Sequence, residues 1–273
     1  MSNNQLYYID ELTGPIQISL AAHETKQLVV RFDYNNKKLE PQEYHRELSI
    51  QVARGGNLEL FILSSLPAQI RNRVQTSITL QTGSGLKLTE LILDEGESTY
   101  HTEAILEGDN ATLDYAGAYG ARNRTKRIHT LLTHHLGRNS RSRTTLKSAL
   151  KDSAHLVFKG LIHVDKEATG TDAYLSNRNM VMNDGCRADS LPQLQIETDE
   201  VACSHGSTTG GVREEELFYL MSRGLPRIDA KGLLVTGHLS SILDRFPPLL
   251  AEEAELAVAS FLLDTERSLS EVA

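Results

Sequence analysis

Tryptophan is absent from this chain of 273 residues, and aromatic residues make up only 5% of it. The hydrophobic core must therefore rest on Leu, Ile, Val and Ala, and aromatic platforms that stack on sugars or bases are scarce. Cysteine occurs twice, as Cys186 and Cys203. Two cysteines do not make a disulfide framework, so we expect reduced thiols.

Three further features are missing from the sequence. No window holds 18 uninterrupted apolar residues, so we expect no membrane-spanning helix. Residues 1–14 have neither the basic nor the apolar stretch of a signal peptide, and a cytoplasmic location is predicted. No G-x-x-x-x-G-K-[ST] motif occurs, so we expect no nucleotide bound by this chain itself.

Short strands and turns dominate the first three quarters of the chain. Residues 1–46 contain brief strand-like runs, and residues 48–201 contain many apolar runs of four to nine residues, several of them alternating, between Gly, Asn and Asp turns. No helical period interrupts them, which argues against alternating strands and helices. The pattern predicts a mainly β protein and fits a sandwich or barrel as well as a solenoid.

The pattern changes after Gly211. Three glutamates, Glu214 to Glu216, complement the N-terminal dipole of a predicted helix with Leu217 and Leu220 on its apolar stripe. A second helix and, after Pro247 and Pro248, a third helix to about residue 266 are expected. The sequence therefore predicts a small helical C-terminal part.

Residues 122–151 contain no Asp or Glu, although the whole chain has a formal net charge of −8. This segment could line a nucleic-acid groove, but it lacks aromatic residues. A solvated strand face, or a face that meets an acidic partner or another part of the chain, is the favoured interpretation. His129, His134 and His135 also lie here, and His134 and His135 point to opposite faces of a strand. Exposed or hydrogen-bonded histidines are favoured over a zinc site. The nine basic residues are Arg122, Arg124, Lys126, Arg127, Arg138, Arg141, Arg143, Lys147 and Lys151.

The main candidate site is Cys203-Ser204-His205, which we expect in a strand followed by a Gly/Ser/Thr loop and a helix. Residues two apart in a strand share a face, so Cys203 and His205 are either two soft metal ligands or a nucleophile with its base. Two ligands do not complete a metal site. Glu197 and Asp199 are weak candidates to orient the histidine, and Cys186 is interpreted as a small core residue.

Four segments resemble one known family. Residues 191–206, LPQLQIETDEVACSHG, and residues 216–224, ELFYLMSRG, are similar to the central motifs of the SufB/SufD family of iron–sulfur cluster assembly scaffolds. Residues 157–160, VFKG, and 171–174, TDAY, fall where that family has related segments. SufB members typically have His-Glu where this chain has His205-Gly206, so the resemblance is closer to SufD.

The resemblance implies a right-handed parallel β-helix, a solenoid, with a helical C-terminal domain. It divides the chain into N-terminal strands (1–46), the β-helix core (47–206) and the helical domain (207–273). It implies a non-enzymatic scaffold that dimerises through the β-helix, with a SufB-like paralogue or a second copy, and forms an Fe–S cluster transiently at the dimer interface. Cys203 and His205 match the interface cysteine and histidine. A SufC-like ABC ATPase would dock on the helices, at Leu217, Phe218, Tyr219, Arg223, Leu233 and Leu234.

Two other functions stay open from the residues alone. One is a β-helix hydrolase or lyase that uses His129, His134 or Cys203, with or without zinc. The other is a nucleic-acid-binding module that uses the basic segment 122–151. Both are less favoured than the scaffold.

Overall fold

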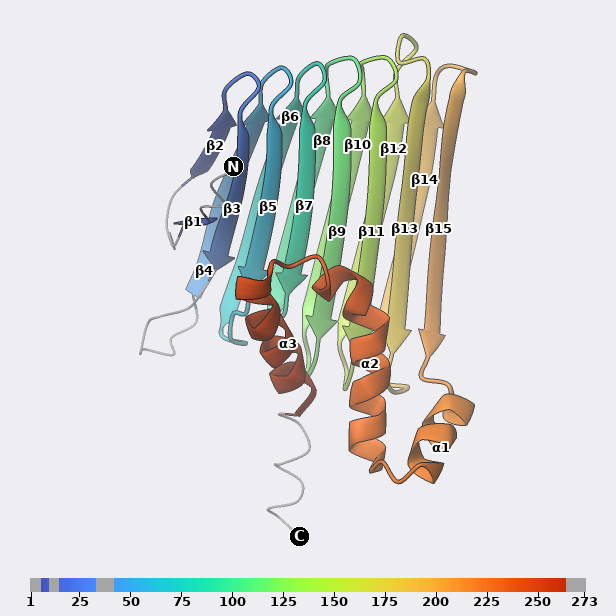
Figure 1. Cartoon of the computed structure of the whole chain (residues 1–273). Helices are drawn as coiled ribbons and strands as arrows, with labels where there is room; N and C mark the ends of the chain where they lie inside the picture. The colour runs from blue at the N-terminus through green and yellow to red at the C-terminus, as the bar shows by residue number, and fades with distance from the viewer. Residues whose placement is uncertain (1–5, 10–14, 33–41, 264–273) are drawn as a thin grey trace.

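Two parallel β-sheets form the body of the protein, in a computed structural model that describes residues 6–9, 15–32 and 42–263 (Figure 1). One sheet is formed by the odd-numbered strands and the other by the even-numbered strands, and we call them the odd sheet and the even sheet. The odd sheet contains, in spatial order, β1 (Leu6–Ile9), β3 (Thr25–Phe32), β5 (Asn57–Ser64), β7 (Gly85–Ile92), β9 (Thr112–Ala121), β11 (Arg141–Leu150), β13 (Thr171–Val181) and β15 (Val201–Gly211). The even sheet contains β2 (Ile16–Leu20), β4 (Gln42–Val52), β6 (Ile70–Leu80), β8 (Glu97–Leu106), β10 (Lys126–His135), β12 (His155–Val164) and β14 (Arg187–Ile196).

The chain alternates between the two sheets and advances by one strand in each sheet per turn. Neighbouring strands of each sheet are parallel, and β10 pairs with β12 so that Lys126 lies beside His155. The chain descends through the odd sheet in front and rises through the even sheet behind while it advances to the right, which is a right-handed path (Figure 1). The predicted β-solenoid is therefore confirmed, and the sandwich and barrel are not.

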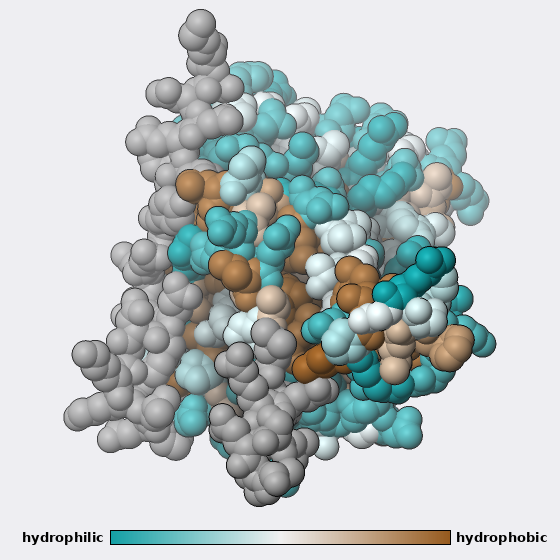
Figure 2. Space-filling view, turned by 60° about the horizontal axis from the view of Figure 1, so that its bottom comes forward, coloured by the Kyte–Doolittle hydropathy of each residue, from teal (hydrophilic) through white to brown (hydrophobic). Residues whose placement is uncertain are grey.

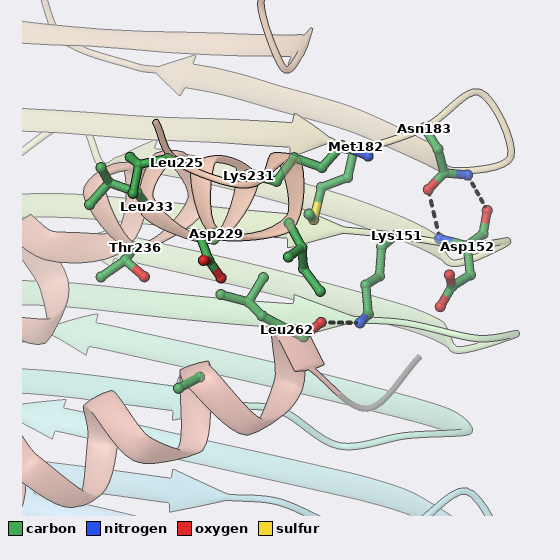
Figure 3. Close-up of a pocket in the computed structure, with 13 residues that line it drawn as sticks. Lys151, Asp152, Met182, Asn183, Leu225, Asp229, Lys231, Leu233, Thr236 and Leu262 are labelled. Atoms are coloured by element: carbon green, nitrogen blue, oxygen red, sulfur yellow. Dashed lines mark hydrogen bonds between the residues drawn. The ribbon is translucent and has the colours of Figure 1, made fainter. Parts of the chain in front are cut away.

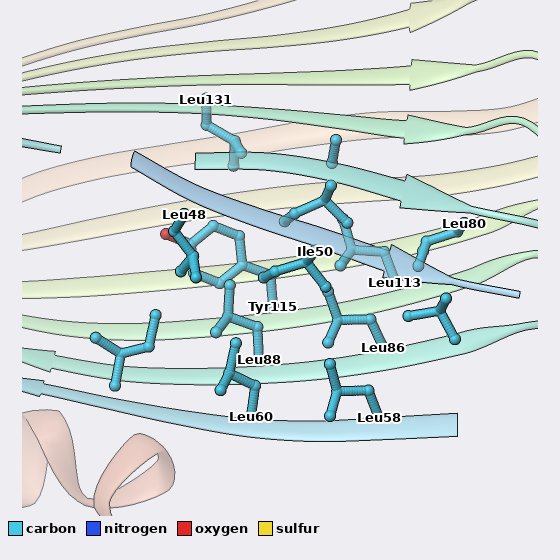
Figure 4. Close-up of a cluster of buried hydrophobic side chains, with 14 of the residues drawn as sticks. Leu48, Ile50, Leu58, Leu60, Leu80, Leu86, Leu88, Leu113, Tyr115 and Leu131 are labelled. Atoms are coloured by element: carbon cyan, nitrogen blue, oxygen red, sulfur yellow. The ribbon is translucent and has the colours of Figure 1, made fainter. Parts of the chain in front are cut away.

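Alternating burial explains why these segments stack as coils. In β6 and β8 every second side chain is buried between the sheets and the others face outward. The inward-facing residues form one continuous apolar cluster along the solenoid (Figure 4). Its labelled members include Leu48, Ile50, Leu58, Leu60, Leu80, Leu86, Leu88, Leu113, Tyr115 and Leu131.

Three helices follow the last strand: α1 (Glu214–Ser222), α2 (Arg227–Leu243) and α3 (Pro248–Leu263). The helices α2 and α3 lie against the outer face of the odd sheet (Figure 1), where β5, β7 and β9 become buried on both faces. The sheet presents Ala116, Ala118 and Ala149 at this contact, and these small side chains let the helices approach closely. None of the three described helices combines the length and apolar character needed to cross a bilayer.

The basic segment 122–151 holds these helices to the sheet. Arg122 donates to the carbonyls of Ser260 and Phe261, and Lys151 donates to that of Leu262 at 3.0 Å, all in the last turn of α3. Positive charge is favourable there because the last carbonyls of a helix carry partial negative charge. Lys147 donates to a carbonyl of α2, that of His238, at 2.7 Å. For Arg122, Lys147 and Lys151, the structure thus shows contact with another part of the chain, which is one of the alternatives that the sequence left open.

The structure corrects one expected element boundary and does not test the expected domain boundaries. The Gly/Ser/Thr loop expected after His205 is wrong, because β15 continues to Gly211 in register with β13. Pairing with an existing strand outweighs the weak strand propensity of glycine. The strands β2 and β3, from the region 1–46, belong to the same two sheets as the later strands. The division at residues 46 and 206 stays a prediction.

A buried carboxyl interrupts the apolar interior. Glu90 on β7 accepts hydrogen bonds from the hydroxyls of Tyr115 at 2.7 Å and Tyr119 at 3.0 Å. Gly117 leaves the space for this arrangement, since a Cβ there would lie 2.3 Å from the Tyr119 hydroxyl. Burial raises the pKa of Glu90 to about 7, and the two tyrosine hydrogen bonds oppose that rise.

The pH dependence of stability tests this buried carboxyl. Because the folded protein holds the Glu90 proton more tightly than the unfolded chain, the free energy of unfolding falls as pH rises from about 4.5 to about 7. We expect Glu90→Gln to remove that dependence. Its stability relative to wild type should rise by roughly 2 to 3 kcal/mol from pH 5 to pH 8 in urea titrations. Glu107→Gln, at an exposed carboxyl, is the control for replacing a glutamate by glutamine. If the stability difference between Glu90→Gln and wild type does not change with pH, the raised pKa of Glu90 is contradicted.

Candidate functional site

The solenoid is uncapped at its C-terminal end in the part of the chain that the structure describes. The even sheet ends at β14 and the odd sheet ends at β15, so each strand has a neighbour on one side only. The two strands meet across this end, where the Ser207 hydroxyl donates to that of Ser190 at 2.8 Å. Leu191 and Ile196 expose 50% and 39% of their surface there. Unpaired main-chain groups beside apolar side chains are typical of a surface that pairs with another chain.

Cys203 and His205 lie on this last strand. Cys203 pairs in register with Ala173 of β13, is half-buried and packs against the interior apolar cluster. His205 pairs with Leu175 and is exposed. The two side chains are two positions apart in a regular strand, so they project to the same side, as the sequence predicts. The structure therefore places a thiol and an imidazole at the open end of the solenoid.

The surroundings of the Cys203 thiol disfavour its ionisation. Burial raises its pKa, and the charge of Asp172 raises it further, while a hydrogen bond with the backbone of Ala173 and the charge of Arg143 lower it. Arg143 is itself held by both carboxylate oxygens of Asp172 at 2.8 Å. A protonated thiol suits a ligand that loses its proton when it binds a metal ion better than it suits a catalytic thiolate.

In the described part of the chain, neither Glu197 nor Asp199 forms a hydrogen bond with His205. Glu197 accepts a hydrogen bond from His163 at 3.1 Å and another from Gln195 at 3.2 Å. Among the described residues, no group of three or more His, Cys, Asp or Glu side chains is arranged to hold a metal ion. Cys203 and His205 therefore form at most part of a ligand set.

The other candidate residues are placed away from the open end or inside the core. His129 is buried among Tyr100, Tyr115, Tyr119 and Phe158, and burial lowers its pKa to about 3. His135 is buried between the hydroxyls of Ser140 and Ser142, at 2.8 and 2.9 Å. Neither ring can reach a substrate. Cys186 packs partly against a small cluster that includes Leu150 and Leu156.

A cavity of about 640 Å³ lies between the helices and the ends of β11 and β13 (Figure 3). Leu225 and Leu233 line it on the helical side, and Lys151, which donates to the Leu262 carbonyl, lies on the sheet side. Neither Cys203 nor His205 lines it. Leu233 also lines an open groove of about 370 Å³ between α1 and α2, together with Tyr219 and Leu234.

The fold and the open end define a class of protein: a parallel β-solenoid with C-terminal helices packed on the outer face of one sheet, and with a thiol and an imidazole on its last strand. The family described as "SUF system FeS cluster assembly, SufBD core domain" matches residues 15–238. This chain belongs to that family.

Curated relatives carry the same family name. An iron-sulfur cluster assembly SufBD family protein of Mycobacterium leprae is 37% identical over 168 residues, 58% of this chain and 43% of that protein. The iron-sulfur cluster assembly protein SufD of Escherichia coli is 36% identical over 137 residues, 50% of this chain and 32% of that protein. SufD of Bacillus subtilis is 27% identical over 156 residues, 57% and 36% respectively. The matches thus span less than half the length of these relatives.

Thiol titration tests the environment of Cys203. In a Cys186→Ser background Cys203 is the only thiol, and we expect iodoacetamide to react with it along a pH profile shifted above that of glutathione in the same buffers. The physical cause is burial of the thiol, which disfavours the thiolate. Urea unfolding should remove the difference. A profile at or below that of glutathione in the folded protein would show an activated thiolate instead.

Proposed function

We propose that this protein is a non-catalytic scaffold subunit of a SUF-type iron–sulfur cluster assembly complex. Family membership supports a place in the SUF system. The observation that supports the more specific role is the uncapped solenoid end, where β14 and β15 have no further partner strand among the described residues and β15 carries Cys203 and His205. The function follows from what that end lacks.

A second chain is required on physical grounds. An Fe–S cluster is generally held by four cysteine or histidine ligands, and this end offers one thiol and one imidazole. The free edges of two sheets can each accept a strand of another solenoid, which satisfies main-chain groups along the length of β14 and β15. The partner is a SufB-like paralogue or a second copy of this chain. The cluster forms transiently at that interface and is the cargo of the complex.

The helical end provides the second proposed surface, for a SufC-like ABC ATPase. Phe218 and Tyr219 on α1 expose 74% and 57% of their surface, and Leu233 on α2 exposes 53%. Figure 2, which brings this end forward, shows apolar side chains among polar ones. Arg223 lies over the Tyr219 ring. Leu217, also expected at this surface, is fully buried, so it supports the helices from inside.

The two surfaces are joined by a short path. The strand β15 carries Cys203 and ends at Gly211, and α1 begins at Glu214. A displacement of α1 by an ATPase would therefore act on the strand that carries the ligands through only two connecting residues, Val212 and Arg213. Movement at the open end on ATP binding is the coupling that we propose.

Substitution of the ligand pair tests the scaffold role. We expect Cys203→Ala and His205→Ala each to abolish Fe–S cluster assembly in cells that depend on this protein, because each removes a ligand at the interface. Both positions lie at the solenoid end, so circular dichroism spectra should stay unchanged. Cys186→Ala is the matched control and should retain assembly. Native mass spectrometry of the protein co-expressed with its SUF partners should show a dimer of solenoid chains with ATPase subunits, and full assembly by both variants would contradict the proposal.

Affinity measurements test the ATPase surface separately. Tyr219→Ala removes a ring that lines the groove between α1 and α2, and Phe218→Ala removes the neighbouring exposed ring of α1. We expect each to weaken ATPase binding about 5- to 30-fold in isothermal titration calorimetry. Leu256→Ala, at an equally exposed apolar residue of α3, is the control and should bind as wild type. A loss confined to Leu256→Ala would place the ATPase on a different face.

A further inference from the structure

Two histidines meet on the outer face of the even sheet, away from Cys203 and His205 in sequence. His134 on β10 and His163 on β12 are direct register partners, and their Nδ1 atoms lie 3.3 Å apart. Their rings are nearly perpendicular, at 83°. The side chains are 27% and 20% exposed, and the helices cover the opposite sheet (Figure 1).

The distance between the two Nδ1 atoms suits a shared metal ion. A tetrahedral zinc-class ion holds imidazole nitrogens at about 2.0–2.1 Å, which places two such nitrogens about 3.3 Å apart. Zinc, cobalt, nickel, copper and iron all accept imidazole nitrogen. The backbone sets this spacing, because neighbouring strands in register present the two side chains side by side.

The other ring nitrogens face carboxylates. His163 Nε2 lies 3.1 Å from Glu197 Oε1, and His134 Nε2 lies 3.7 Å from Glu103 Oε1. A carboxylate behind the distal nitrogen is the usual support of a metal-bound histidine, because it fixes the proton on that nitrogen. Each histidine of this pair has such a carboxylate at its Nε2 atom.

When both rings are neutral, proton placement favours a metal over a hydrogen bond between the rings. His163 donates its Nε2 proton to Glu197, so its neutral ring offers a lone pair at Nδ1. If His134 donates its Nδ1 proton to that lone pair, a neutral His134 ring has no proton at Nε2, which is buried without a hydrogen-bond partner and faces a carboxylate. A metal bound to both Nδ1 atoms leaves protons on both Nε2 atoms, each directed at a carboxylate.

We propose that His134 and His163 bind a divalent transition-metal ion of the zinc class through their Nδ1 atoms, with Glu103 and Glu197 orienting the rings. Water fills the remaining coordination positions, because the site lies on an exposed sheet face. Its two histidines lie on β10 and β12, and only Glu197, which directly follows the edge strand β14, adjoins the proposed cluster interface.

Zinc titration of the full chain tests the site. We expect Zn²⁺ binding by calorimetry, a tetrahedral Co²⁺ absorption spectrum, and loss of both in His134→Ala and in His163→Ala. Glu197→Gln should weaken Zn²⁺ binding on the order of 10-fold. The matched control is His155→Ala, which removes another outward histidine of β12 that bonds to a carboxylate, that of Asp189. It should bind as wild type.

Two further measurements separate this site from the others. A Cys203→Ser/His205→Ala double variant should keep the zinc binding, so failure of the cluster role and failure of this site are distinguishable. Long-range ¹H–¹⁵N spectra should show Zn²⁺ shifting the Nδ1 resonances of His134 and His163 with both Nε2 atoms protonated. Zinc binding that survives in His134→Ala and His163→Ala, or that is absent from wild type, would overturn the proposal.

Discussion

Parallel main-chain pairing is the constraint on which the rest of this structure depends. In a parallel solenoid the backbone groups of each coil are satisfied by the coils before and after it, so the last coil is left with unpaired groups on one side. Here that coil is formed by β14 and β15, which also carry the motif with Cys203 and His205. The edge with unpaired main-chain groups and the proposed ligand set are therefore at the same place. In the proposed function, one partner chain completes both.

The helical layer is a second consequence of the same architecture. A solenoid has two outer faces, and the three described helices cover part of one of them. They pack on small residues such as Ala116 and Ala118, and Arg122, Lys147 and Lys151 donate to their carbonyls. The even sheet keeps its outer face free of the three helices, and there the register brings His134 beside His163. Each face of one solenoid thus has a different chemistry.

The strands and helices could be predicted from residue patterns. The contacts between coils could not, because they depend on how neighbouring strands are aligned. Alternation in segments such as 70–80, and the glutamates before Leu217, are local signals, so strands and helices were predictable. The placement of Cys203 and His205 on one side of one strand was predictable because they are two residues apart. His134 and His163 were not paired in advance, because 29 residues separate them and only coil stacking makes them neighbours. For the same reason the basic segment did not reveal that it holds α2 and α3, and the strand at Gly206–Gly211 was obscured by its composition.

Hydrogen–deuterium exchange at the open end tests the central claim most directly. The amides of β14 and β15 that point away from β12 and β13 should exchange quickly in the isolated chain and slowly in the complex with a second solenoid chain. Amides inside β9 and β11 should be protected in both states. A complex that forms without any change in β14 and β15, with new protection elsewhere on the solenoid, would contradict the account.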